Sequence, residues 1–294
     1  MPRRRARRAA TIPQAPGDLT PAWFSASLAH LSGGATVVDV RTDVIGTDIG
    51  FAGEVVRCHL DWGGSTSDAT PPTVIVKLPA ANAKNRASTE AVGAYEREIL
   101  VYRELGDGLG LPIPRHLHSD MTPNPAPWME RVLVALFDHL PQRALERLTR
   151  GALALAAKSR RRYVLVLEDV ADARPPRQRD GGSIDDALAA LDVLARFHAT
   201  NWLRLPHVGT RPFIHPVDRA PRLRQAAYSR NREEFLERFA DVLTPAIVER
   251  LDRTQEHLPA LVAHLAAPPW TVLHGDFRLD NILFRPSGDL VVLD

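Results

Sequence analysis

Three stretches of alternating apolar residues near the start of the chain constrain its fold most. Thr36–Ile45, Phe51–Trp62 and Thr73–Leu78 are rich in valine and isoleucine, and such alternation is typical of strands that bury one face. Turn segments that contain glycine separate them, at 46–50 and at 63–72. Because successive strands joined by turns pair in opposite directions, the sequence predicts a three-stranded antiparallel sheet.

Helices and further strands are expected around this sheet. Leu19–Leu31 reads as a short amphipathic helix, and Glu90–Leu105 has apolar residues at helical spacing before a glycine-rich stop. Two more strands are expected at Pro112–His118 and Tyr163–Val170. The residues between them, 121–162, suggest a helical insertion of two helices broken near Pro141.

The second half of the chain has helical periodicity. Ser183 and Asp186 resemble a capping box at the start of a helix. The expected apolar stripe of this helix is Ile184, Leu188, Leu191, Ala195, His198 and Trp202. Two further helices are expected at Arg232–Asp241 and Pro245–Leu265. A strand-rich part followed by a helical part predicts an α+β protein with two lobes and a ligand cleft between them.

The charge distribution sets apart the first residues. Met1–Ala10 carries five arginines and no acid, whereas the whole chain has a net charge of only +2. We therefore expect a basic disordered tail over residues 1–18, which is the only part that favours nucleic acid. No apolar run reaches the roughly 20 residues that span a bilayer. The single cysteine, Cys58, cannot form an internal disulfide, which favours a cytoplasmic protein with a buried structural thiol.

The strongest chemical signal lies in the last segment, Thr271–Asp294. It reads as a buried-type strand at Thr271–Leu273, the loop HGDFRLDN at 274–281, and a strand pair around Ser287 and Gly288 that ends at Asp294. Phosphoryl transfer from ATP needs a carboxylate that accepts the hydroxyl proton and oxygen ligands that hold magnesium. Kinase catalytic loops supply these groups as H-x-D-x-x-x-x-N followed by an aspartate, and this segment has the same spacing.

The loop HGDFRLDN resembles the catalytic loop of aminoglycoside phosphotransferases, choline kinases and ecdysteroid-kinase-like relatives. In these families glycine replaces the arginine of the protein-kinase H-R-D motif, which argues against a protein kinase. The resemblance implies a protein-kinase-like bilobal fold, with Asp276 as the catalytic base and Asn281 and Asp294 as magnesium ligands. It implies that His274 holds the loop in place, while Asp280 is expected to make only local hydrogen bonds.

Lys77 is the second candidate, because only three of the 37 basic residues are lysines. On a strand, Lys77 and Ile75 share one face while Val74 and Val76 share the other. A kinase strand lysine contacts the ATP phosphates and pairs with a helix glutamate. Within the helix expected at Glu90–Leu105, Glu98 best fits the family pattern, with Glu96 as the alternative.

Two further segments are candidates for nucleotide contacts. Gly50 and Gly53 match two glycines of a phosphate-binding loop, although Asp48 stands at the first glycine position and a plain hairpin turn is equally compatible. The stretch Leu167–Val170 resembles the family's hinge, which implies that the backbone of Glu168 to Val170 holds the adenine.

These residues predict a phosphotransferase that depends on ATP and magnesium and acts on the hydroxyl group of a small molecule. The expected division is an ATP-binding N-lobe at 19–170 and a helical C-lobe at 171–294. Related kinases continue beyond the residue matching Asp294, so the C-lobe is expected to be truncated. A catalytically inactive nucleotide-binding or interaction protein is the alternative. The acceptor and the oligomeric state stay open.

Overall fold

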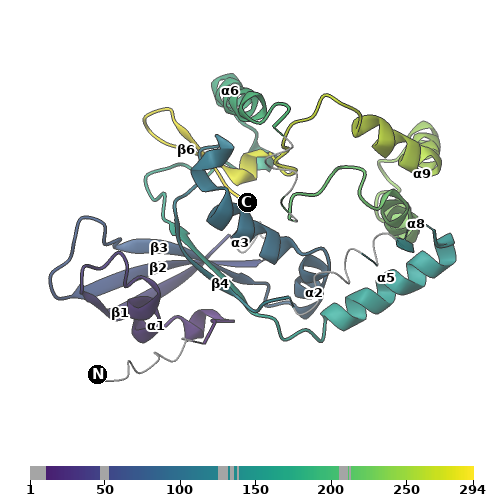
Figure 1. Ribbon diagram of the computed structural model, residues 1–294. Coiled ribbons are helices and arrows are strands. Elements are labelled where there is room, and N and C mark those ends of the chain that lie inside the picture. The colour runs from purple at the N-terminus through teal and green to yellow at the C-terminus, as the bar shows by residue number, and fades with distance from the viewer. Residues whose placement is uncertain are drawn as a thin grey trace. The chain divides into compact units, whose positions relative to one another are not determined.

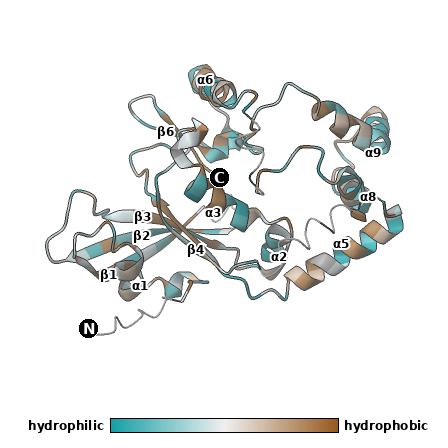
Figure 2. Ribbon diagram, viewed as in Figure 1, coloured by the Kyte–Doolittle hydropathy of each residue, from teal (hydrophilic) through white to brown (hydrophobic). Residues whose placement is uncertain are grey.

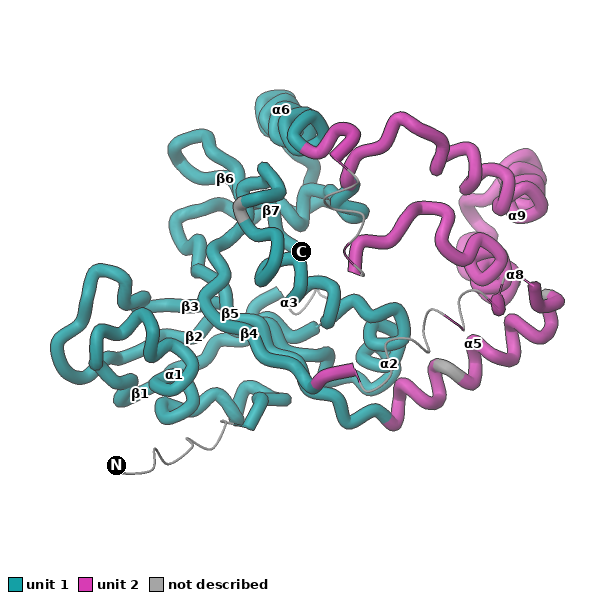
Figure 3. Tube along the Cα trace, in the orientation of Figure 1, with its two compact units in different colours: residues 1–122, 159–200, 273–294 teal, residues 123–158, 201–272 magenta. Residues whose placement is uncertain are grey.

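The computed structural model describes residues 11–46, 53–124, 132, 136–137, 139–204, 211 and 213–294. The described residues form two compact units (Figure 3). Unit 1 comprises Met1–Thr122, Ser159–Thr200 and Leu273–Asp294, and unit 2 comprises Pro123–Lys158 and Asn201–Val272. All of the candidate site residues fall in unit 1. The division into lobes at residues 170 and 171 stays a prediction.

A five-stranded antiparallel sheet forms the centre of unit 1 (Figure 1). Its strand order is β1-β2-β3-β5-β4, and every neighbouring pair runs antiparallel. The α+β class is therefore confirmed, as are the three strands expected first and their antiparallel pairing. The strands are β1 (Thr36–Ile45), β2 (Gly53–Gly63), β3 (Thr73–Pro79), β4 (His116–Met121) and β5 (Tyr163–Glu168).

Each face of the sheet is covered by a different helix. Val74 and Val76 of β3 are fully buried in a cluster with Trp23 and Phe24 of helix α1 (Pro21–Ser27). The opposite face packs against helix α3 (Ala94–Glu104) in a second cluster that includes Ile75. Figure 2 shows apolar and polar residues interspersed along the strands of this sheet. Strand alternation thus places Lys77 on the α3 side, as the sequence predicts.

The helix expected over Glu90–Leu105 is α3, which begins four residues later than expected and follows a separate helix. Helix α2 (Ala83–Ala91) begins at an Asn82 cap, whose side-chain oxygen accepts the backbone N–H groups of residues 84 and 85. Helix α3 follows after Gly93, which has a φ of 67°. Because this left-handed conformation is favourable only for glycine, Gly93 redirects the chain between the two helices. The apolar periodicity alone did not reveal this break.

Helix α6 (Ile184–Thr200) and the hairpin of β6 (Ile282–Phe284) and β7 (Leu290–Val292) complete unit 1. The expected apolar stripe of α6 is not its buried face, because Ile184, Leu188 and Leu191 are all more than half exposed. Ala190 instead packs against β6 and β7. The hairpin requires the neighbouring face of the helix, so the contact partner and not the widest apolar stripe sets the rotation of α6.

Two further expectations are corrected by the structure. Thr271–Leu273 does not form a strand, since it pairs with none of the described strands and Leu273 is exposed. Residues 11–18 were expected in the disordered tail, but Ile12 packs against the sheet cluster and accepts a hydrogen bond from Arg162. The Asp18 carboxylate accepts two backbone N–H groups of the same segment. The arginine-rich residues 1–10 lie outside the described part of the chain.

Unit 2 is helical in its described residues. Helix α8 (Pro221–Arg238) packs against α5 (Gln142–Ala156) and against α9 (Pro245–Leu265). Helix α9 has the expected bounds, whereas α8 begins 11 residues before the expected Arg232 because Pro221 occupies its first turn. Helix α5, the helix of segment 121–162 that the structure describes, therefore packs with α8 within unit 2. In the ranges that the structure describes, no helix has the length and apolarity needed to cross a bilayer.

Cys58 lies fully buried on the α1 side of β2. Burial, with a smaller contribution from Asp43, raises the pKa of its thiol to about 12. A thiol with such a pKa is not ionised at neutral pH and is a poor nucleophile. The expectation of a structural thiol is confirmed.

The structure predicts that Gly53→Ala will destabilise the sheet. A Cβ atom at this position would lie 2.6 Å from the carbonyl oxygen of Leu78 on the paired strand β3, and that backbone atom cannot rotate away. We expect a loss of about 1–3 kcal/mol in the free energy of unfolding. Chemical unfolding would measure it, with Gly108→Ala as the matched control because nothing lies within 4 Å of its Cβ position. Equal stability of the two variants would contradict the close approach.

Candidate functional site

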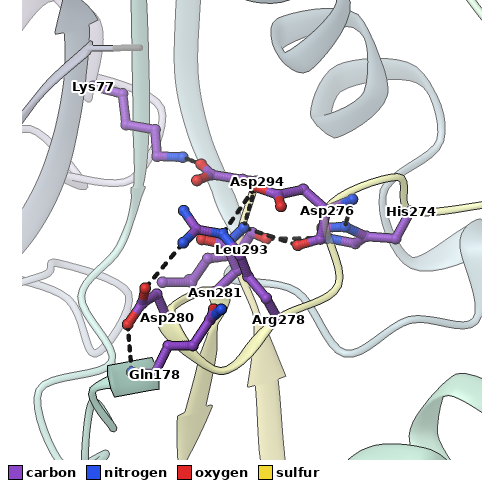
Figure 4. Close-up of polar contacts among 9 residues, drawn as sticks. All are labelled: Lys77, Gln178, His274, Asp276, Arg278, Asp280, Asn281, Leu293 and Asp294. Atoms are coloured by element: carbon purple, nitrogen blue, oxygen red, sulfur yellow. Dashed lines mark hydrogen bonds and ion pairs between the residues drawn. The ribbon is translucent and has the colours of Figure 1, made fainter. Parts of the chain in front are cut away.

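The ammonium group of Lys77 on β3 contacts both helix α3 and the last residue of the segment Thr271–Asp294. It lies 2.6 Å from Oε1 of Glu98 on α3, and it contacts Oδ1 of Asp294 (Figure 4). The lysine side chain is 17% exposed, so its charge is partly removed from water and needs these partners. Glu96, the alternative partner, pairs with Arg161 at 2.7 Å instead.

His274 fastens the catalytic loop at its start. Its Nε2 donates to the carbonyl oxygen of Leu293 at 3.1 Å, and its Nδ1 accepts the backbone N–H of Asp276 at 3.3 Å. One donor and one acceptor are what a neutral imidazole offers. Burial lowers the pKa of His274 and the Lys77 charge adds to this, although the Leu293 carbonyl and Asp276 oppose it. The histidine therefore holds the loop in its neutral form.

Asn281 fastens the loop at its other end. Its side chain is buried, and Nδ2 donates at 3.0 Å both to the carbonyl oxygen of Asp276 and to Oδ2 of the same residue. Since both amide hydrogens are used, Oδ1 is the atom left to act as a ligand. The Asp276 side chain itself is 62% exposed. The structure thus brings together the expected base and one expected metal ligand.

The β6–β7 hairpin carries the loop to Asp294. Asn281 directly precedes β6, and Asp294 follows β7 by two residues. The backbone N–H of Leu293 donates to the carbonyl oxygen of Asn281 at 2.8 Å, which joins the two ends of the hairpin. Because β6 and β7 are antiparallel, the chain leaves the loop at Asn281 and returns beside it at Asp294.

The charges gathered here suit a divalent cation bound with a polyanion. Four carboxylates, of Glu98, Asp276, Asp280 and Asp294, face two cations, of Lys77 and Arg278. Amide and carboxylate oxygens are ligands that magnesium prefers, and Asn281 and Asp294 supply one of each. No group of three or more His, Cys, Asp or Glu side chains with metal-binding geometry occurs in the described ranges, so any ion here would need oxygens from elsewhere.

The other nucleotide candidates are placed unequally. Gly50 lies outside the described residues. Gly53 is required by its close approach to Leu78, whatever its part in phosphate binding. Glu168 ends β5, and its backbone N–H is already bonded to the carbonyl oxygen of Arg115 at 2.9 Å. No backbone hydrogen bond is recorded from the N–H of Val170 among the described residues.

Two arginines that the sequence did not single out hold the hinge segment. Arg57 of β2 pairs with Asp169 at 2.9 and 3.1 Å, and the aspartate side chain is only 2% exposed. Arg285, after β6, pairs with Asp172 at 3.1 Å and lies 3.7 Å from Glu168. Asp169 directly follows the apolar strand β5. This position could have indicated an ion pair, since a buried carboxylate requires a cationic partner. With 34 arginines in the chain, the sequence could not show which one.

Comparison with known families identifies the class of protein that has this α+β fold and these residues. Residues 66–294 match the model of the phosphotransferase enzyme family, APH. The match covers most of the chain and includes β3, the catalytic loop and Asp294, so the protein belongs to this family. The resemblance read from HGDFRLDN is thereby confirmed. A search of curated proteins found no match.

The hydrogen bonds of His274 predict a loss of stability in acid. Because folding lowers its pKa, its contribution is complete above the usual imidazole value of about 6.5 and is lost as pH falls through the lowered value. Thermal unfolding across this range should show a smaller acid-dependent decline in His274→Gln than in the parent. His116 and His118 also have lowered pKa values, and they are common to both proteins. Identical pH dependence of the two would contradict the neutral assignment.

Proposed function

We propose that this phosphotransferase transfers the terminal phosphoryl group of ATP, with magnesium, to the hydroxyl group of a small molecule. The observation that carries the proposal is the convergence of Lys77, Asp276, Asn281 and Asp294 within unit 1. These are the groups that phosphoryl transfer from ATP requires, and they lie in the order and spacing of kinase catalytic segments. A single buried thiol agrees with the cytoplasm, where we place the activity.

Lys77 orients the phosphates, and Glu98 orients Lys77. In the structure the ammonium contacts both Glu98 and Asp294. Phosphate oxygens can take up one of its hydrogens while Glu98 retains another, because an ammonium group has three donors. The lysine thus keeps its helix anchor when nucleotide is bound. The adenine would lie against the hinge, and the backbone N–H of Val170 would be its donor.

Asn281 and Asp294 are the residues that would hold magnesium. A bound magnesium ion neutralises charge on the phosphates and aligns them for transfer. The protein would present ligand oxygens in fixed positions. Oδ1 of Asn281 is fixed because the amide nitrogen of the same side chain makes two hydrogen bonds to Asp276. The Asp294 carboxylate is fixed through Lys77.

Asp276 accepts the proton of the attacking hydroxyl group. Its carboxylate is exposed, and it is held at Oδ2 by Asn281. A carboxylate held in position beside the reacting hydroxyl lowers the barrier mainly by orientation. Since the charges of the transition state are met by Lys77 and the metal, catalysis would rest on positioning and neutralisation.

Asp276→Ala should abolish magnesium-dependent ATP turnover and leave ATP binding nearly unchanged, because Asp276 meets the acceptor and not the purine. Turnover would be followed with and without magnesium, using water and a panel of small alcohols as acceptors, and ATP affinity would be measured by calorimetry. Equal turnover by variant and parent would refute Asp276 as the base. A parent that binds ATP but never turns it over would identify an inactive nucleotide-binding protein instead.

Lys77→Ala should weaken ATP binding by about tenfold or more, since a charge-assisted hydrogen bond to phosphate contributes about 1.5–3 kcal/mol. Lys158→Ala is the matched control, because Lys158 is exposed and lies in unit 2. Calorimetric titration with ATP and magnesium would measure both variants. Equal affinities for the two would count against Lys77 as a phosphate ligand.

A further inference from the structure

The carboxylate of Asp276 receives two hydrogen bonds on one oxygen. Oδ2 accepts Nε of Arg278 at 3.1 Å and Nδ2 of Asn281 at 3.0 Å. Among the described residues none is hydrogen-bonded to Oδ1 of Asp276, and the side chain is exposed. Two donors on one oxygen restrict rotation of the carboxylate and direct the other oxygen outward. Asn281 has a proposed role as a ligand, whereas Arg278 has none so far.

Arg278 is itself held from behind. Its Nη1 donates to Oδ2 of Asp280 at 2.9 Å, and the Asp280 side chain is only 14% exposed. The second oxygen of Asp280 accepts the backbone N–H of Gln178 at 2.8 Å (Figure 4). Gln178 lies about a hundred residues earlier, in the 3-10 helix η3 (Gln178–Asp180). Asp280 was expected to make only local bonds, and this contact corrects that expectation.

The arrangement controls how the guanidinium meets Asp276. An arginine beside an aspartate favours a bidentate pair that occupies both carboxylate oxygens. Here Asp280 binds the Nη1 end of the guanidinium, which excludes an Asp276 pair through both terminal nitrogens, and among the described residues only Nε is hydrogen-bonded to Asp276. The base is thereby held by a single arginine hydrogen bond, and one of its oxygens stays available for a proton. Without Asp280, the fork of Arg278 could turn and cover both oxygens.

We propose that Arg278 and Asp280 are positioning residues for the base, linked in the order Gln178 N–H, Asp280, Arg278, Asp276. This inference rests on the proposed function, because it assumes that Asp276 is the base. Arg278 fixes the orientation of the carboxylate. Asp280 prevents Arg278 from blocking that carboxylate. The two roles differ, so the variants should differ in a defined way.

The kinetic test uses Arg278→Gln, Asp280→Asn and the double variant, measured by magnesium-dependent ATP turnover with water as acceptor. We expect each single variant to lower kcat about 10- to 100-fold, as small misplacements of a catalytic group do, with KM for ATP within about twofold of the parent. The double variant should be no slower than Arg278→Gln alone, because Asp280 acts only through Arg278. Arg179→Gln, at an exposed arginine in η3, is the matched control.

Three kinetic outcomes would overturn the proposal. Parental kcat in either single variant would remove the positioning role. Losses that multiply in the double variant would show that Asp280 acts independently of Arg278. Losses explained by a lower unfolding midpoint, or by KM alone, would show a merely structural role. Asp280→Asn keeps the shape and one acceptor for Gln178, and Arg278 is partly exposed, so both variants should fold.

A second measurement does not depend on turnover. Hydrogen exchange at Nε of Arg278, followed by NMR in the protein without nucleotide, should be slow in the parent and faster in Asp276→Asn and in Asp280→Asn. Equal exchange in all three would overturn the linkage. If the parent bound ATP without turning it over, the proposed function would fail, and this measurement would still decide whether Asp280 holds Arg278 on Asp276.

Discussion

The ion pair group around Lys77 is the contact on which the site depends. Its ammonium group contacts Glu98 of α3 and Asp294 after β7. Lys77 therefore connects the strand-rich part of the chain with the segment Thr271–Asp294. Its position follows from strand alternation, because Val74 and Val76 must face the α1 cluster. Burial of Val74 and Val76 therefore decides on which face of the sheet the Lys77 ammonium group lies.

The sequence predicted the elements whose signal is local and repeated. Alternating residues located β1, β2 and β3 almost to the residue, and the expected start of α9 at Pro245 agrees with the structure. It failed where the outcome depends on a partner. The stripe Ile184, Leu188 and Leu191 has good helical spacing, yet α6 buries Ala190 because the β6–β7 hairpin lies on that side. Thr271–Leu273 has strand composition, but none of the described strands pairs with it.

The candidate site shows the same division. A motif with fixed spacing singled out Asp276, Asn281 and Asp294 as candidate residues, and the scarcity of lysine singled out Lys77. The arginines of the site could not be predicted in this way. The chain has 34 arginines, and its sequence gives no reason to select Arg57, Arg278 or Arg285 as site residues. The roles of Arg57 and Arg285 depend on distant carboxylates, Asp169 for Arg57 across 112 residues of sequence and Asp172 for Arg285 across 113. Long-range pairing of this kind is a property of the folded chain.

The geometry of one short turn explains how the catalytic loop serves several partners at once. The 3-10 helix η4 (Leu279–Asn281) has about three residues per turn, so its consecutive side chains point roughly 120° apart. Leu279 packs with the cluster at β6 and β7, Asp280 reaches the Gln178 backbone, and Asn281 reaches Asp276. An α-helical turn would separate these directions less evenly. Because the three anchors lie in different directions, the turn cannot rotate without breaking one of them, and this constraint holds the Asp276 side chain in place.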